Sequence, residues 1–258
     1  MKKSRFTDSD EGRLLRLEKT VSGPADRRGN KRARGSEHAG WGGEHADWDD
    51  EHTGWDDGHA GWGNEEHAGR QVPILDTPRL SLRSWTDADL LPYTRLNADP
   101  RVMRYFPRVL SAPESRAQMR RLRTFLMEHG WGVWAVTLKS TGEFIGMTGL
   151  HAVEKDSGIP HAPLTEIAWR MLPDHWGRGH APEAARRVMQ FAFEVLALDA
   201  VHAFTATVNG PSRRVMTKIG MVDTGEVFDH PALPGGHVLQ RHCLYVMTRA
   251  QWERGMAG

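Results

Sequence analysis

The sequence predicts an α/β (α+β) fold: a mixed, mostly antiparallel sheet of about seven strands with helices on both faces, preceded by a disordered tail. Three observations lead to this prediction. Two apolar segments, residues 131–138 and 143–153, flank Lys139–Gly142, which is a strong hairpin signal. The strand-like segment Leu164–Leu172 is followed by a glycine turn and a helix. Two more strand-like segments, residues 221–228 and 242–248, lie near the end of the chain.

Residues 1–70 are predicted to form the disordered, low-complexity tail, and residues 71–258 the folded domain. The tail holds a seven-residue repeat from Glu37 to Asn64, with one Trp and one His in each copy. Each copy is rich in Gly and Asp and has too few apolar residues for a coiled coil. Metal binding by the histidines and base stacking on the tryptophans are the alternatives. Histidines in a flexible chain have no preset coordination geometry, and the acidic residues would repel phosphate, so we predict disorder.

The overall charge and cysteine content exclude several classes of protein. The chain has 34 Lys+Arg against 33 Asp+Glu, so it has no global attraction to nucleic acid or to a membrane. Its single cysteine, Cys243, excludes an intramolecular disulfide framework and suits the reducing cytoplasm. No apolar run reaches membrane-spanning length, and the basic start lacks the apolar core of a secretory signal. We therefore expect a cytoplasmic protein with no membrane or nucleic-acid partner.

The first half of the folded part begins with a strand at residues 80–83, where two leucines alternate with polar residues. A helix follows, with Thr86 as its N-cap and Asp89 as its capping partner. A longer helix is expected to begin at Ser111 and to end at Gly130.

The second half is expected to hold a helix at Glu183–Leu198 and a buried strand at Ala200–Val208. A short helix from about Pro211 to Ile219 comes next, and Gly220 ends it. Residues 229–236 are rich in Pro and Gly and are expected to form a loop between the last two strands.

The glycine turn at His175–Ala185 organises the folded part. Gly177 and Gly179 flank Arg178, and Pro182 stands where a first helical residue would sit, a position that tolerates its missing N–H. A strand, a glycine turn and a helix start point several free N–H groups into one concavity at a positive helix end. Such a concavity binds phosphate, so we predict a cofactor that carries a pyrophosphate.

Four stretches in this order carry a resemblance to a known family: residues 77–89 (TPRLSLRSWTDAD), 166–185, 208–221 and 242–252. The chain resembles the GNAT-family acyltransferases over about residues 74–250. Within that family it is similar to the Rim-type ribosomal-protein N-acetyltransferases, which share a Trp at the first position of the glycine motif. The resemblance implies a GNAT fold over residues 71–258 and acetyl-CoA as the acyl donor.

The resemblance also implies which residues hold the cofactor. Backbone N–H groups of the glycine motif bind the pyrophosphate, and the Arg178 side chain lies along the phosphates. A bulge in the strand that precedes the motif offers backbone groups to the pantetheine arm, while Asn209 and Ser212 contact the pantetheine and a phosphate. A plain turn and helix cap is the alternative for Asn209 and Ser212. The implied cofactor-binding residues are Trp169, Arg170, Met171, Leu172, Trp176, Gly177, Arg178, Gly179, His180, Ala181, Asn209 and Ser212.

Acetyl transfer to an amine needs a base that removes a proton from the ammonium group. Glu166 is the candidate catalytic residue because it stands in an otherwise apolar strand just before the expected bulge. The alternative is a structural carboxylate paired with Arg170 or another cation. Many relatives place a tyrosine acid where this chain has Met216, and the strand position of Tyr245 does not match, so water or a helix dipole is expected to serve the leaving thiolate.

The leading hypothesis is an N-acetyltransferase that moves the acetyl group of acetyl-CoA directly to a primary amine in a ternary complex. The acceptor is a protein N-terminal amine or a small molecule; no metal is expected, and a homodimer is possible. The first alternative is a non-catalytic sensor that binds acyl-CoA in the same cleft, and the second is an interaction protein that acts through its tail. His230 and His242 are candidate groups on the acceptor side.

Overall fold

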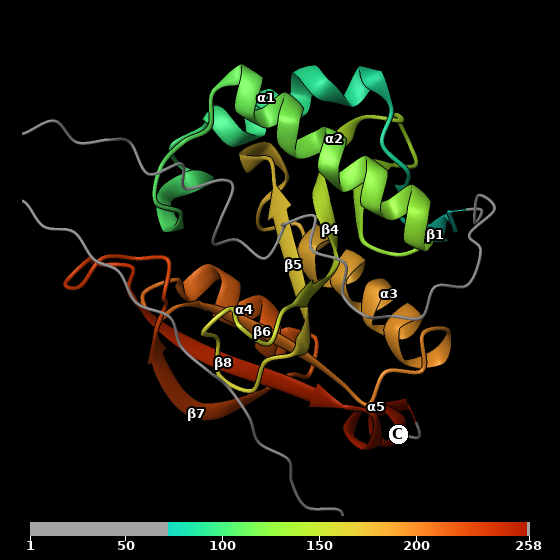
Figure 1. Ribbon diagram of the computed structural model, residues 1–258. Coiled ribbons are helices and arrows are strands. Elements are labelled where there is room, and N and C mark those ends of the chain that lie inside the picture. Colours follow the sequence, from blue (N-terminus) through green and yellow to red (C-terminus); the bar gives the residue numbers. More distant parts are fainter. Residues whose placement is uncertain (1–71, 257–258) are drawn as a thin grey trace, which may run out of the picture. The chain divides into compact units, whose positions relative to one another are not determined.

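The computed structural model of the protein describes residues 72–256, so the predictions for the tail lie outside the described residues. The described chain forms one sheet of eight strands in the order β1-β2-β3-β4-β5-β6-β8-β7 (Figure 1). This is the mixed, mostly antiparallel sheet that the sequence predicts, with one more strand. The added strand, β1 (Leu75–Asp76), is only two residues long, which is too short to show a periodic pattern.

The other strands are β2 (Leu80–Arg83), β3 (Val133–Leu138), β4 (Phe144–Val153), β5 (Leu164–Met171), β6 (Ala200–Ala206), β7 (Val222–Asp229) and β8 (Arg241–Thr248). The α-helices are α1 (Leu90–Ala98), α2 (Ala112–His129), α3 (His180–Glu194), α4 (Gly210–Lys218) and α5 (Arg249–Met256). Three short 3₁₀ turns are η1 (Asp87–Asp89), η2 (Met103–Tyr105) and η3 (Pro173–His175).

The predicted signals at the starts and ends of the early helices are confirmed. Ser111 and Glu114 form a capping box at the start of α2, and Gly130 ends that helix with a φ of 72°. Thr86 and Asp89 form the same box at η1, which leads into α1. At Ser111, the hydroxyl accepts the Glu114 N–H, one of the donors that the first helical turn leaves without an intrahelical partner.

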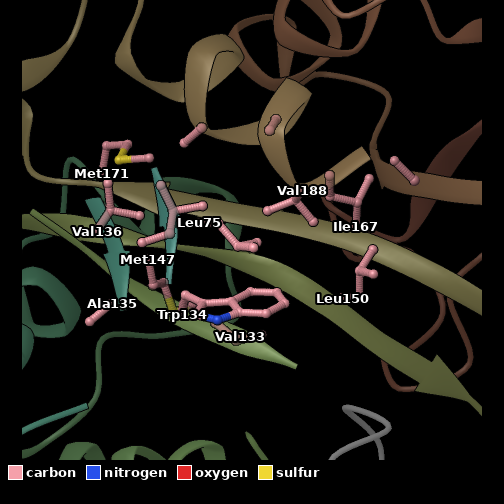
Figure 2. Packing of buried hydrophobic residues seen from close by; sticks show 14 of the residues in the cluster. Leu75, Val133, Trp134, Ala135, Val136, Met147, Leu150, Ile167, Met171 and Val188 are labelled. Carbon is pink, nitrogen blue, oxygen red and sulfur yellow. The ribbon is translucent and has the colours of Figure 1, made fainter. Parts of the chain in front are cut away.

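Helix α3 covers one face of the sheet, and α1 covers the opposite face. Ile167 of β5 and Leu150 of β4 lie against Val188 of α3 in the buried core (Figure 2). Arg170, three residues after Ile167, hydrogen-bonds Asn97 of α1 instead. Because successive side chains of a strand alternate between faces, residues of β5 with even numbers point away from α3.

The sheet opens between β5 and β6, its only parallel neighbours among the described strands. These two strands are paired at a single position, Glu166 with His202, near the start of both. Figure 1 shows β4 and β5 rising toward α1 while β8 and β7 run across below them. The carboxyl ends of β5 and β6 therefore separate, and the glycine loop and α4 begin at these two ends.

The prediction of a bulge at Trp169–Leu172 is wrong with respect to β4, because β5 pairs with β4 without a bulge there. The β4–β5 register continues without a break from Val153–Leu164 to Gly146–Met171. Backbone groups at this end of β5 face an open edge because β6 separates from β5, and not because β5 bulges away from β4.

No helix in residues 72–256 is long and apolar enough to span a membrane.

Candidate active site

The glycine loop forms a row of free backbone donors at the start of α3. Gly177 and Gly179 have φ values of 73° and 78°, a conformation that glycine adopts without strain. Gly179 is the N-cap of α3, and the first helical hydrogen bond runs from the Glu183 N–H to the Gly179 carbonyl. Within the described residues, no hydrogen bond is donated by the backbone N–H groups from Gly177 to Ala181. These donors lie at the positive end of the helix dipole, where an anion is favoured.

Helix α3 begins earlier than the sequence indicates, at His180, so Pro182 is its third residue and not its first. A residue at that position would direct its N–H toward the carbonyl four residues before it, which belongs to Arg178. That carbonyl already accepts a hydrogen bond from Nη1 of Arg79, at 2.9 Å. Pro182 therefore costs the helix no hydrogen bond. The helix also ends at Glu194, before the predicted Leu198.

Arg79, in the turn between β1 and β2, holds the glycine loop in place, a role that the sequence did not reveal. Its Nε donates to Oε2 of Glu183 at 2.6 Å, and its Nη1 donates to the Arg178 carbonyl. The Thr77 hydroxyl donates to Oε1 of Glu183 at 2.6 Å. Burial raises the pKa of Glu183, but the hydrogen bonds from Thr77 and Arg79 outweigh it, so this pKa lies below its usual value. The carboxylate next to the loop is therefore ionised and neutralised by Arg79.

Two residues of the loop connect it to the sheet and the core. The Trp176 indole N–H donates to the Met171 carbonyl at 2.7 Å, which links the loop to the open end of β5. The His180 side chain is buried, and burial lowers its pKa, with a smaller effect from the charge of Arg79. A neutral, buried ring leaves the backbone N–H as the group that His180 presents in the loop.

The start of α4 forms the other side of the opening. Asn209 caps the helix, since its Oδ1 accepts the Ser212 N–H at 3.2 Å. Its Nδ2 donates to the Thr205 hydroxyl of β6 at 2.9 Å. The cap that the sequence offered as an alternative role for this pair is thus present.

A basic hollow lies beside α4. Arg213 Nε donates to the Tyr245 hydroxyl at 3.3 Å, and burial raises the pKa of that tyrosine. The hollow has a volume of about 470 Å³ and is lined by Gly210, Arg213, Arg214, Thr217, Lys218 and Tyr245. Its three cations add positive potential near the start of α4.

Glu166 lies on the face opposite α3, at the point where β5 and β6 are last paired. Its Oε2 is 2.7 Å from Nε2 of His151, and both side chains are 10% exposed. The sequence left open a pairing with Arg170, but Arg170 bonds Asn97 and stacks over the Phe106 ring at 4.2 Å. The partner of Glu166 is therefore a histidine of the neighbouring strand.

The two histidines expected on the acceptor side lie in an aromatic cluster. The His230 and His242 rings are 4.7 Å apart and contact Phe204 and Phe228. Phe204 is two residues from His202 in β6, so it points to the same face as Glu166. Burial lowers the pKa of His242, which favours its neutral form.

The residues that border the opening suit a ligand with a pyrophosphate and a long, narrow arm. The free N–H groups lie at Gly177–Ala181, and a Cβ placed on Gly177 would meet no atom within 4 Å, so the loop is open to a ligand. Trp169–Met171 lie on the open edge of β5, and the N–H of Leu172 donates to the Ile145 carbonyl of β4.

The described residues contain no group of three or more metal-ligating side chains.

Comparison with known proteins agrees with this geometry. The acetyltransferase (GNAT) domain family matches residues 79–222, which is more than half of the chain. An FsC-acetyl coenzyme A-N(2)-transacetylase of Aspergillus fumigatus is 30% identical over 189 residues, which cover 70% of this chain and 79% of that protein.

Two solved structures show the same fold. A GNAT-family acetyltransferase from Bacillus anthracis superposes with a TM-score of 0.58 at 23% identity, covering 69% of this chain and 99% of that one. A spermidine N-acetyltransferase from Vibrio cholerae, solved with CoA and spermine, gives a TM-score of 0.54 at 17% identity, covering 69% and 99%. The fold, the glycine loop and the family match lead to one conclusion: this chain is an N-acetyltransferase of the GNAT family.

Proposed function

We propose that the protein transfers the acetyl group of acetyl-CoA directly to a primary amine, with Glu166 as the base. The observation that carries this proposal is the position of Glu166 beside the opening between β5 and β6. The donor loop follows the end of β5 at α3, whereas Glu166 points to the face opposite α3. Donor and acceptor can thus approach the opening from different sides and be bound together.

The residues of the chain have separate tasks in this proposal. The N–H groups of Gly177–Ala181 hold the pyrophosphate, and the open edge at Trp169–Leu172 receives the pantetheine arm. The starts of α3 and α4 flank the opening, so their dipoles favour the thiolate that leaves. The names of the Aspergillus and Vibrio relatives, which refer to acetyl coenzyme A and to CoA, support this choice of donor.

An acceptor ammonium with a pKa of about 8–10 must lose a proton before it can attack. Glu166 Oε1 takes that proton and passes it to solvent. A C–N bond then forms to the acetyl carbon, the C–S bond breaks, and the second proton of the nitrogen goes to sulfur. The products are an N-acetyl amide and free CoA, and the acceptor is either a peptide N-terminus or a small amine.

An acetyl-CoA consumption screen tests the proposal on the full chain, over amines and peptides with free N-termini. Release of CoA thiol is read with a chromogenic disulfide, and the single cysteine of the chain, Cys243, is buried and adds little background. We expect turnover in the wild type and a loss of about 10²–10⁴-fold in kcat/KM for Glu166→Gln. The Kd of CoA is expected to stay unchanged, because Gln keeps the size of the side chain.

Two outcomes would contradict the proposal. Tight CoA binding without turnover for any amine, in the wild type as in Glu166→Gln, would favour an acyl-CoA sensor. Full activity of Glu166→Gln at all pH values would show that another group removes the proton.

A further inference from the structure

The contact between His151 and Glu166 is the closest buried approach of a histidine to a carboxylate in residues 72–256. Nε2 of His151 lies 2.7 Å from Oε2 of Glu166, and each side chain is 10% exposed. The two residues are register partners on the antiparallel strands β4 and β5, so their Cβ atoms lie side by side on one face. The strands themselves thus hold the pair together.

The contact fixes one oxygen of the carboxylate. Nε2 of His151 lies within hydrogen-bond distance of Oε2 of Glu166, and both side chains are held in place by the pairing of their strands. Within the described residues, this is the one polar contact recorded for the Glu166 side chain, and it involves Oε2 and not Oε1.

We propose that His151 is a positioning residue for Glu166: its contact with Oε2 holds the carboxylate so that Oε1 faces the acceptor amine. This inference rests on the proposed role of Glu166 as the base. The assignment differs from a general structural role in one respect, which is that the orientation of the Glu166 carboxylate depends on the polar contact with His151.

Other titratable groups lie near Glu166 and set the background of any pH measurement. His202 is its register partner on β6, and burial, with a smaller effect from the charge of His161, lowers the pKa of His202. Arg170 lies four residues along β5 on the same face. His161 is paired in turn with Glu226. A change at His151 leaves all four of these groups in place.

Two substitutions separate the donor from the volume of the ring. His151→Phe fills the space without a donor, and His151→Gln keeps an N–H at a similar reach. We expect His151→Phe to lower kcat/KM for the amine by about 10²-fold, as a small misplacement of a catalytic group does. His151→Gln should recover most of the activity, and CoA should bind all variants with the wild-type Kd.

The chain offers a matched control. Nε2 of His161 and Oε2 of Glu226 are also 2.7 Å apart, but these side chains are 61% and 39% exposed. Glu226→Gln breaks this exposed pair and is expected to leave kcat/KM unchanged. A fall in Glu226→Gln equal to that in His151→Phe would overturn the proposal, because any histidine–carboxylate pair would then have the same effect.

A second measurement does not depend on turnover. The ¹³C signal of the Glu166 carboxylate, assigned by its loss in Glu166→Gln, is recorded in the full chain with CoA bound. We expect this signal to move in His151→Phe, because the polar contact at Oε2 is lost, and to stay near its wild-type position in His151→Gln. An unchanged signal in His151→Phe would overturn the inference. A wild type that acetylates no amine would instead refute the proposed function, whatever the spectrum shows.

A double-mutant cycle completes the test. If His151 acts through Glu166, His151→Phe lowers the remaining activity of Glu166→Gln by no more than about twofold. Fully additive losses would show that His151 acts independently of Glu166 and would overturn the proposal.

Discussion

Arg79 and Glu183, which are 104 residues apart in the sequence, are joined by a charged hydrogen bond of 2.6 Å between Nε and Oε2. Glu183 is in the first turn of α3, and the same guanidinium also donates to the Arg178 carbonyl of the glycine loop. Arg79, beside the first strands of the sheet, therefore holds the loop in place, and the N–H groups that we propose for cofactor binding stay free of these contacts.

Loss of this contact is expected to weaken CoA binding. In Arg79→Met, the Glu183 carboxylate stays near the pyrophosphate site without its cation, and the Arg178 carbonyl loses a donor. We expect the Kd of CoA to rise about tenfold, which corresponds to about 1.4 kcal/mol. Arg79→Lys keeps the charge but cannot reach both acceptors, so an intermediate Kd is expected. Isothermal titration calorimetry on the full chain measures these values.

Arg101 provides the control for this prediction. It forms a 2.6 Å ion pair with Asp99, but its side chain is 66% exposed. Arg101→Met removes one positive charge, as Arg79→Met does, and should leave the Kd of CoA unchanged. Equal weakening in both variants would mean that general charge, and not the contact with the loop, sets the affinity.

Asn209 combines a structural role with a proposed binding role, and two substitutions can separate them. Asn209→Ala removes the cap of α4 and should cost about 1 kcal/mol in the free energy of unfolding. Asn209→Asp keeps the cap acceptor, so stability should be close to that of the wild type, but the new negative charge should raise the Kd of CoA. Urea unfolding and calorimetry give the two quantities. If Asn209→Asp binds CoA with wild-type affinity, Asn209 only caps the helix.

Glu114 should make stability depend on pH. The hydrogen bond from Arg108, followed by those from Ser111, lowers the pKa of Glu114 from 4.5 to about 2. A lowered pKa in the folded state means that this carboxylate stabilises the protein above pH 4.5, and that the effect is lost as the pH falls toward 2. Glu114→Ala should therefore lower the free energy of unfolding by about 1 kcal/mol at pH 7 and by less at pH 3.

Asp87 is the control for Glu114, since it also pairs with an arginine, Arg123, but its side chain is 95% exposed. Asp87→Ala is expected to change stability by less than about 0.5 kcal/mol at either pH. A difference between wild type and Glu114→Ala that stays constant from pH 7 to pH 3 would contradict the assignment.

The sequence was informative wherever a structural feature depends on residues close in the chain. The capping boxes at Thr86 and Ser111, the helix stop at Gly130 and the glycine turn at Gly177 and Gly179 can each be predicted from a few neighbouring residues. Such features rest on local hydrogen bonds and on allowed values of φ, both of which residue type controls. The GNAT family could be predicted in the same way, because its motifs are short and occur in a set order.

The tertiary structure decided how distant segments meet. From the sequence we expected a bulge in β5, whereas the β4–β5 register is unbroken. The strand β6 separates from β5 after the pair Glu166 and His202. The sequence offered Arg170 as a partner for Glu166, whereas strand register places His151 there. No pattern in the sequence predicted that Thr77 and Arg79 contact Glu183.

By itself, then, the sequence determined the family, the glycine turn and the ends of most elements, because local backbone preferences encode them. The structure decided what holds that loop and which side chain touches the candidate base. Both depend on the register and the separation of strands far apart in the chain, which follow from packing of the whole core and not from any one segment.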